Sequence, residues 1–212
     1  MTTAAPPRSL IVACGALARE IQAIVSINDL RNVSVEYLPG RLHNRPEQIP
    51  ERVRTRIRNA RPHFDRILVG YADCGTGGML DKVCEEERVE RLPGAHCYEI
   101  YAGPTDFATM AEDQPGTFYL TDYMVRYFDI IVWSGLGLDR HPELMPMYFG
   151  NYTRVVHLAH DDDPELFAAA QEQAARLGLV YERLDCGYGD LEHLIVDHVE
   201  IRTPSQPRSM AE

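Results

Sequence analysis

Short apolar runs alternate with amphipathic stretches along the first half of the chain. Continuous or alternating apolar residues predict three strands, at residues 8–14, 33–38 and 64–71. The segments between and after them carry apolar side chains three or four positions apart, which predicts helices at residues 16–27, 46–58 and 79–87. This half is therefore predicted to run as three strand–helix units.

The same alternation continues in the second half. Strands are predicted at residues 117–120, 129–134, 154–159 and 179–184, and helices at residues 121–128 and 164–177. Gly178 directly follows the last of these helices, as expected of a C-terminal cap. Repeated strand–helix alternation predicts an α/β fold with a mostly parallel sheet and helices on both of its faces.

The domain organisation has two readings. Residues 64–71 and 128–135 both place Phe-Asp before an apolar run and a glycine, which would fit two similar Rossmann-like lobes at 9–103 and 116–202. A chance repeat explains these few letters equally well. In both readings residues 9–202 form a single α/β domain, because the length suits one domain. The Pro-, Ser- and Thr-rich ends, residues 1–8 and 203–212, are expected to be flexible.

Composition and charge exclude several classes of protein. Of the 212 residues 45% are hydrophobic and 25% are charged, as in globular proteins with a packed core. The net charge of −11 argues against binding to nucleic acid or to an anionic membrane surface. The apolar runs are shorter than the roughly 18 residues of a membrane span, and no signal-peptide pattern opens the chain. We therefore expect a cytoplasmic protein whose five cysteines are reduced.

Cysteine and histidine side chains follow several of the predicted strands. Cys14 ends the first strand and Cys74 comes just after the third, each before a glycine, and His43 follows the second strand by a few residues. Cys97 comes after residues 91–94, where another crossing of the sheet would return the chain to the same edge. Ligands collect at the carboxyl ends of parallel strands, and thiolates with imidazole suit zinc. These four residues are our candidate metal ligands. No Cys-x-x-Cys pair supports them, so the fold would have to assemble the site; the alternative is that the cysteines are small buried apolar residues.

The glycines beside these cysteines suggest a ligand cradle. Gly15, Gly75, Gly77 and Gly78 would allow tight turns, and backbone N–H groups at the start of a helix can bind a carboxylate or a phosphate. We expect them to contact a cofactor. Their spacing matches neither the dinucleotide fingerprint nor the P-loop, so the glycines could equally serve only to let Cys74 reach a metal.

Other cysteines and histidines are weaker candidates. Cys84 lies on a charged helix and is expected to be structural, and Cys186 follows the last strand, where it could approach from the second lobe. His157 and His160 precede three aspartates and a proline. That pattern favours a helix N-cap over a metal site.

Four segments together resemble a known family. They read IVACGALAREI at 11–21, LPGRLHNRPEQIPERV at 38–53, ILVGYADCGTGGML at 67–80 and PGTFYLTDY at 115–123. Residues 9–198 thereby resemble the domain of unknown function 1638 family (DUF1638). Tyr71 and Tyr119 lie within these segments and are our candidate catalytic residues.

The resemblance implies a place in metabolism. Members of the family tend to be encoded near corrinoid proteins and methyltransferases, which implies a small-molecule substrate in methyl or one-carbon transfer. The leading hypothesis is a zinc enzyme, because zinc sites activate thiols and polarise leaving groups. One alternative is an iron–sulfur enzyme using the same cysteines. Others are a non-enzymatic accessory protein that handles metal or a corrinoid, and a purely structural metal site with the function near Tyr119, Asp122 and Cys186.

Overall fold

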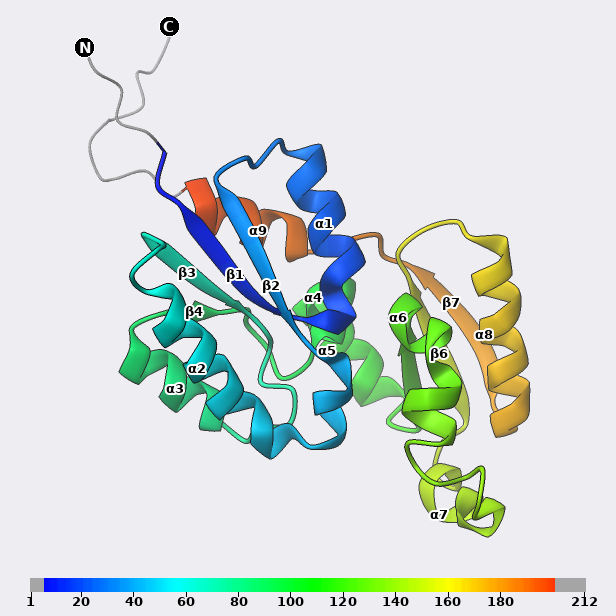
Figure 1. Cartoon of the computed structure of the whole chain (residues 1–212). Helices are drawn as coiled ribbons and strands as arrows, with labels where there is room; N and C mark the ends of the chain where they lie inside the picture. Colours follow the sequence, from blue (N-terminus) through cyan, green and yellow to red (C-terminus); the bar gives the residue numbers. More distant parts are fainter. Residues whose placement is uncertain (1–5, 201–212) are drawn as a thin grey trace, which may run out of the picture.

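The computed structural model describes residues 6–200, and its strands form two parallel sheets (Figure 1). The first sheet has the order β2-β1-β3-β4, with β1 (Ser9–Cys14), β2 (Val33–Leu38), β3 (Arg66–Gly70) and β4 (Glu90–Arg91). The second has the order β5-β6-β7, with β5 (Thr117–Thr121), β6 (Arg154–Ala159) and β7 (Val180–Asp185). All pairs are parallel, which confirms the predicted α/β class.

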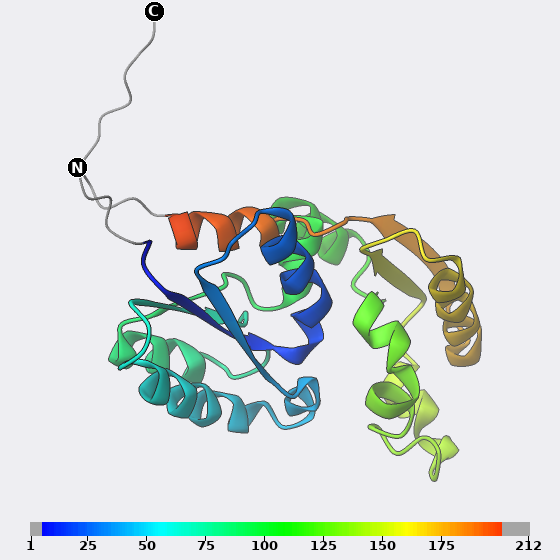
Figure 2. The same cartoon turned by 45° about the horizontal axis from the view of Figure 1, so that its top comes forward.

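Helices cover both faces of the first sheet. α1 (Ala18–Ile27) and α9 (Leu191–Glu200) lie on one face, and α2 (Ile49–Ala60) and α3 (Met79–Glu87) lie on the other (Figures 1 and 2). Every residue of β1 is buried, as expected of a central strand between two layers of helices. Short 3₁₀-helices occur at Gly15–Leu17, Gly40–Asn44, Pro46–Gln48 and Pro142–Leu144.

The second sheet is also covered on both faces. The helices of this lobe are α6 (Asp122–Arg126), α7 (Met145–Phe149) and α8 (Pro164–Leu177). Successive side chains of β5 point to opposite faces of the sheet: Phe118 and Leu120 pack with these helices, whereas Tyr119 joins the core of the first lobe. α4 (Cys97–Ala102) and α5 (Pro104–Asp113) lie between the two sheets. The side chain of Asp163 caps the start of α8, and the backbone of Gly178 caps its end, as predicted.

One predicted strand is wrong. Residues 129–134 form a π-helix, Asp129–Trp133, and not a buried strand. Only Val132 of this helix is buried, and Ile130 is 67% exposed. A short apolar run cannot by itself distinguish a strand from one turn of helix, and the contacts of Trp133 with Arg176 on α8 favour the helix. The Phe-Asp repeat therefore does not mark two equivalent strands.

The chain crosses from the first lobe to the second and then returns to the first. Strands from residues 9–103 form the first sheet and strands from 116–202 form the second, but α9 returns to pack on the first. Asn28 Nδ2 donates to Glu192 Oε1 at 2.9 Å, and Arg66 donates to the carbonyls of His198 and Val199 at 3.3 and 3.2 Å. Within residues 6–200 no helix is long and apolar enough to cross a membrane. The expected flexible residues 1–5 and 203–212 lie outside the described residues.

Candidate functional site

Cys14 ends β1 in a tightly constrained turn. Its thiol is buried and accepts a hydrogen bond from the Ala16 N–H at 3.3 Å. A Cβ at Gly15 would lie 3.0 Å from the Leu38 carbonyl oxygen at the end of β2, so the turn requires a small residue there. Burial raises the pKa of Cys14 to about 11. The isolated thiol is therefore neutral at physiological pH.

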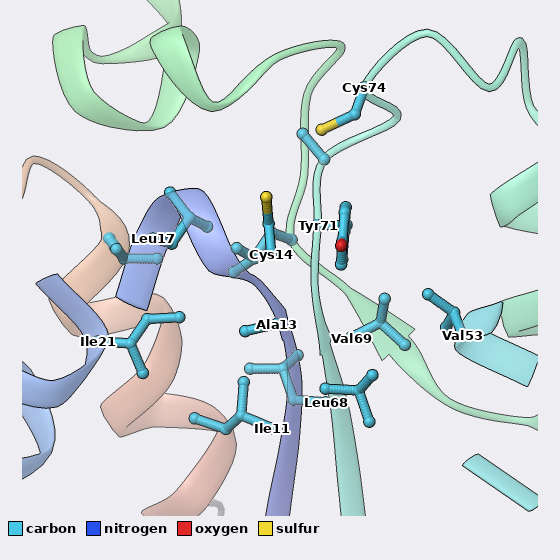
Figure 3. Close-up of a cluster of buried hydrophobic side chains, with 14 of the residues drawn as sticks. Ile11, Ala13, Cys14, Leu17, Ile21, Val53, Leu68, Val69, Tyr71 and Cys74 are labelled. Atoms are coloured by element: carbon cyan, nitrogen blue, oxygen red, sulfur yellow. The ribbon is translucent and has the colours of Figure 1, made fainter. Parts of the chain in front are cut away.

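Cys74 lies in a strained loop between β3 and α3. Its φ is +52°, in a region that residues other than glycine rarely adopt, and Gly75, Gly77 and Gly78 follow with positive φ values. Backbone strain of this kind is found where the surrounding structure holds a side chain in a required position. Figure 3 shows the sulfur atoms of Cys14 and Cys74 pointing into the same space beyond β1 and β3, with Tyr71 beside them.

The N–H groups of this loop have an internal partner. The Asp73 carboxylate accepts from Gly77 N–H at 3.0 Å, from Gly78 N–H at 2.9 Å and from the Thr76 hydroxyl at 2.6 Å. Partial burial works against ionisation, but these hydrogen bonds hold the pKa of Asp73 below its ordinary value. We expected these N–H groups to bind an external anion, but they bind a carboxylate of the same loop.

His43 links the two thiols. Its Nδ1 lies 2.8 Å from the Gly40 carbonyl oxygen and 3.8 Å from Cys14 Sγ, and Cys74 raises its pKa. Since a carbonyl oxygen only accepts, Nδ1 carries the proton and the lone pair of the neutral ring is on Nε2. Burial lowers the pKa of His43, but Cys74 and the Gly40 carbonyl outweigh it and raise the value. The ring also stacks on Tyr71, with centroids 6.2 Å apart.

Cys97 completes the group, which we call the Cys/His cluster: Cys14, His43, Cys74 and Cys97. It is the first residue of α4, after β4. Burial raises the pKa of Cys97 well above its usual value, and negative charge on Cys74 and Cys14 would raise it further. Within residues 6–200 no three His, Cys, Asp or Glu side chains are arranged closely enough to hold a metal ion as they stand.

The two candidate catalytic tyrosines occupy different environments. Tyr71 is fully buried, and its hydroxyl makes no hydrogen bond within residues 6–200. Tyr119 on β5 packs against Phe107 and Tyr98, with ring centroids 5.0 and 5.5 Å away. Tyr98 follows Cys97 directly, so Tyr119 is one aromatic layer further from the cluster.

A polar cavity of about 180 Å³ lies between the lobes. It is lined by the start of α1 and by residues that follow β5, β6 and β7: Arg19, Glu20, Gln22, Asp122, Arg126, His160, Asp161 and Tyr188. Tyr101 lies beside one of these residues. Its ring lies 4.0 Å from that of His160, and the charges of Glu20 and Cys97 both raise its pKa in addition to burial.

A buried network fixes one wall of this cavity. His157 Nε2 donates to Asp122 Oδ1 at 2.8 Å, and His157 Nδ1 lies 3.1 Å from the Tyr181 hydroxyl. The other carboxylate oxygen of Asp122 accepts from the His160 N–H at 3.3 Å. From the sequence, Asp122 was predicted only in one alternative site, and His157 and His160 only as neighbours of a helix cap. The signal for this network is a histidine in an otherwise apolar strand, VVHLA.

The remaining cysteines differ in their surroundings. Cys84 is buried within the first lobe's core, on α3, away from the other thiols' loops. Cys186 follows β7, donates to the Ala159 carbonyl at 3.3 Å and lies 3.7 Å from His160 Nδ1. It therefore approaches the polar cavity, not the Cys/His cluster.

Comparison with known families gives one match. The family described as "Protein of unknown function (DUF1638)" matches residues 37–195. The chain belongs to DUF1638. The matched range contains His43, Cys74 and Cys97 together with Asp122 and His160, so most of the cluster and of the cavity lie within the part shared with DUF1638. No curated protein and no solved structure matches the chain significantly.

Proposed function

We propose that this DUF1638 protein is a zinc-dependent enzyme of methyl or one-carbon transfer, with the Cys/His cluster as its metal site. The observation that supports the proposal is that Cys14 and Cys74 point into the same space at the carboxyl ends of β1 and β3, with His43 Nδ1 3.8 Å from Cys14 Sγ (Figure 3). Cys97, after β4, would be the fourth ligand. Parallel sheets place their ligand sites at this edge.

The donor set fits zinc chemically. Cys14, Cys74 and Cys97 would supply sulfur, and His43 would supply Nε2, since the Gly40 carbonyl already holds the Nδ1 proton. A backbone carbonyl that orients a histidine in this way is a common second layer around metal sites. The side chains would need to move closer together, because they do not form a closed set as they stand.

The chemistry follows from the surroundings of these residues. Bound zinc would supply Lewis acidity and hold a thiol in its reactive, deprotonated form. The chain itself excludes water from this site, because Cys14, Tyr71 and Cys74 are buried. The polar cavity between the lobes would take the small-molecule substrate. A corrinoid protein or methyltransferase as methyl donor is the partner that the family resemblance suggests.

Metal analysis tests the proposal. We would purify wild type, Cys74→Ser and Cys84→Ser anaerobically and measure zinc and iron per chain, together with absorption and circular dichroism spectra. We expect about one zinc in wild type and in Cys84→Ser, and its loss in folded Cys74→Ser. Brown protein with iron and visible absorption would instead indicate an iron–sulfur cluster on the three thiols. Wild type without metal would refute a metal site.

Turnover distinguishes an enzyme from an accessory protein. Zinc-loaded wild type would be assayed for demethylation of a methylated corrinoid with small thiols as acceptors, with folded Cys74→Ser as the inactive control. Tight binding of the corrinoid without turnover would favour the accessory role. If chelation unfolds the protein and no turnover is found, the metal site is structural.

A further inference from the structure

The polar cavity between the lobes has a charged inner wall. Glu20, at the start of α1, lines it together with Asp122, Arg126 and His160, while Arg19, Gln22, Asp161 and Tyr188 surround its mouth. Its volume of about 180 Å³ equals about six water molecules at about 30 Å³ each, which is enough for a small organic molecule.

Glu20 is a buried carboxylate without a partner for one of its oxygens. Only 5% of the residue is exposed, and Oε2 makes no hydrogen bond within residues 6–200. Both oxygens of the neighbouring Asp122 are, by contrast, hydrogen-bonded, to His157 and to the His160 N–H. Buried carboxylates in proteins are normally paired, so an unpaired one that lines a cavity points to a cationic group of a ligand.

The same cavity offers unpaired donors for an anionic group. Asp163 and Asp161 hold the end of the Arg126 guanidinium at 3.3 and 3.7 Å, but its buried Nε–H has no partner in the described chain. Arg19 at the mouth makes no ion pair with any residue between 6 and 200, and its charge lowers the pKa of Glu20 against the effect of burial. Guanidinium N–H groups are suited to bind a carboxylate.

We propose that this cavity binds a small α-amino acid as its zwitterion, with the ammonium group at Glu20 and the carboxylate at Arg126 and Arg19. A ligand with a single charge would leave one of these groups unpaired, whereas a zwitterion pairs both. No residue of the Cys/His cluster takes part, so the binding site does not depend on the metal. If the proposed function holds, the amino acid is the substrate.

Ligand binding to the full chain tests this inference. The twenty standard amino acids would be screened by saturation-transfer NMR, and the strongest would be measured by calorimetry beside acetate and methylammonium, which carry one charge each. We expect at least one amino acid to bind, and both single-charge probes to bind at least tenfold more weakly. Failure of all twenty, or methylammonium binding as tightly as the best amino acid, would overturn the proposal.

Matched variants locate the site. Glu20→Gln and Arg19→Gln should each weaken amino-acid binding at least tenfold, whereas Glu112→Gln, an exposed acid on α5, should leave it unchanged. Thermal unfolding establishes that each variant is folded. Equal affinity in wild type and Glu20→Gln would contradict the assignment. Folded Cys74→Ser should bind the amino acid like wild type, so loss of metal and loss of this ligand are separate results.

Discussion

Glu20→Gln should make the protein more stable while it removes the ligand site. The substitution keeps the shape of the side chain and removes its charge. Burial raises the pKa of Glu20, and the negative charge of Asp122 raises it further, although Arg126 and Arg19 partly oppose this. The folded chain thus binds the Glu20 proton more tightly than the unfolded chain does.

The magnitude follows from the buried, unpaired Oε2. Leaving a buried acceptor without a partner costs about 1–3 kcal/mol, and more when it is charged. Glutamine still buries polar atoms, so we expect it to recover about 1–2 kcal/mol in the free energy of unfolding at pH 8. For a chain of this length that corresponds to a rise in Tm of about 2–8 °C.

The pH dependence gives the sharper test. The wild type gains stability as the pH falls through the raised pKa of Glu20, and the gain is complete below the ordinary carboxyl pKa. In urea unfolding between pH 8.5 and 5.5, the free energy of unfolding of Glu20→Gln should therefore exceed that of wild type by an amount that narrows toward low pH. Glu112→Gln should have the same free energy of unfolding as wild type throughout. A Glu20→Gln protein less stable than wild type at pH 8, or a gap independent of pH, would refute the reasoning.

Two further predictions concern stability. Asp122→Ala should lower the free energy of unfolding by about 3–5 kcal/mol, because it removes the acceptor of both the buried His157 Nε2–H and the His160 N–H. Tyr181→Phe removes one hydrogen bond and should cost about 0.5–1.5 kcal/mol. Equal losses in urea unfolding would show that the network is not organised around Asp122. Gly70→Ala places a Cβ 2.8 Å from Ala13 Cβ on the neighbouring strand and should cost about 1–3 kcal/mol, and an unchanged urea midpoint would contradict this close packing.

Much of the fold could be predicted from local pattern, because central parallel strands are continuous apolar runs. The run around β1 is buried along its whole length, and Pro164–Leu177 has both its caps in the sequence. The π-helix at Asp129–Trp133 could not be predicted, since a run of four apolar residues after Asp129 suits a strand or a helix equally well. The stacking of Trp133 on Arg176 is a tertiary contact, which the local sequence does not show. β4 was missed because its two residues, Glu90 and Arg91, are charged.

The candidate site was predictable in part for the same reason. Residues just after strands must meet at one edge, and Cys14 and Cys74 do point into one space. Glu20 could not be found in this way. On the sequence it occupies an ordinary position in an amphipathic helix, and only the second lobe, packed against α1, buries it beside Asp122.

The return of α9 to the first lobe affects how the chain is made. The strands of the first sheet are complete once residue 91 has been synthesised, but Leu191, Ile195 and Val199 belong to the same hydrophobic core. That core therefore stays open on one side while residues 92–190 leave the ribosome and the second sheet forms. Most multi-lobed chains fold from the N-terminus onward, one unit after another. Here the first core is completed only by the last helix, so both lobes should reach their native state together.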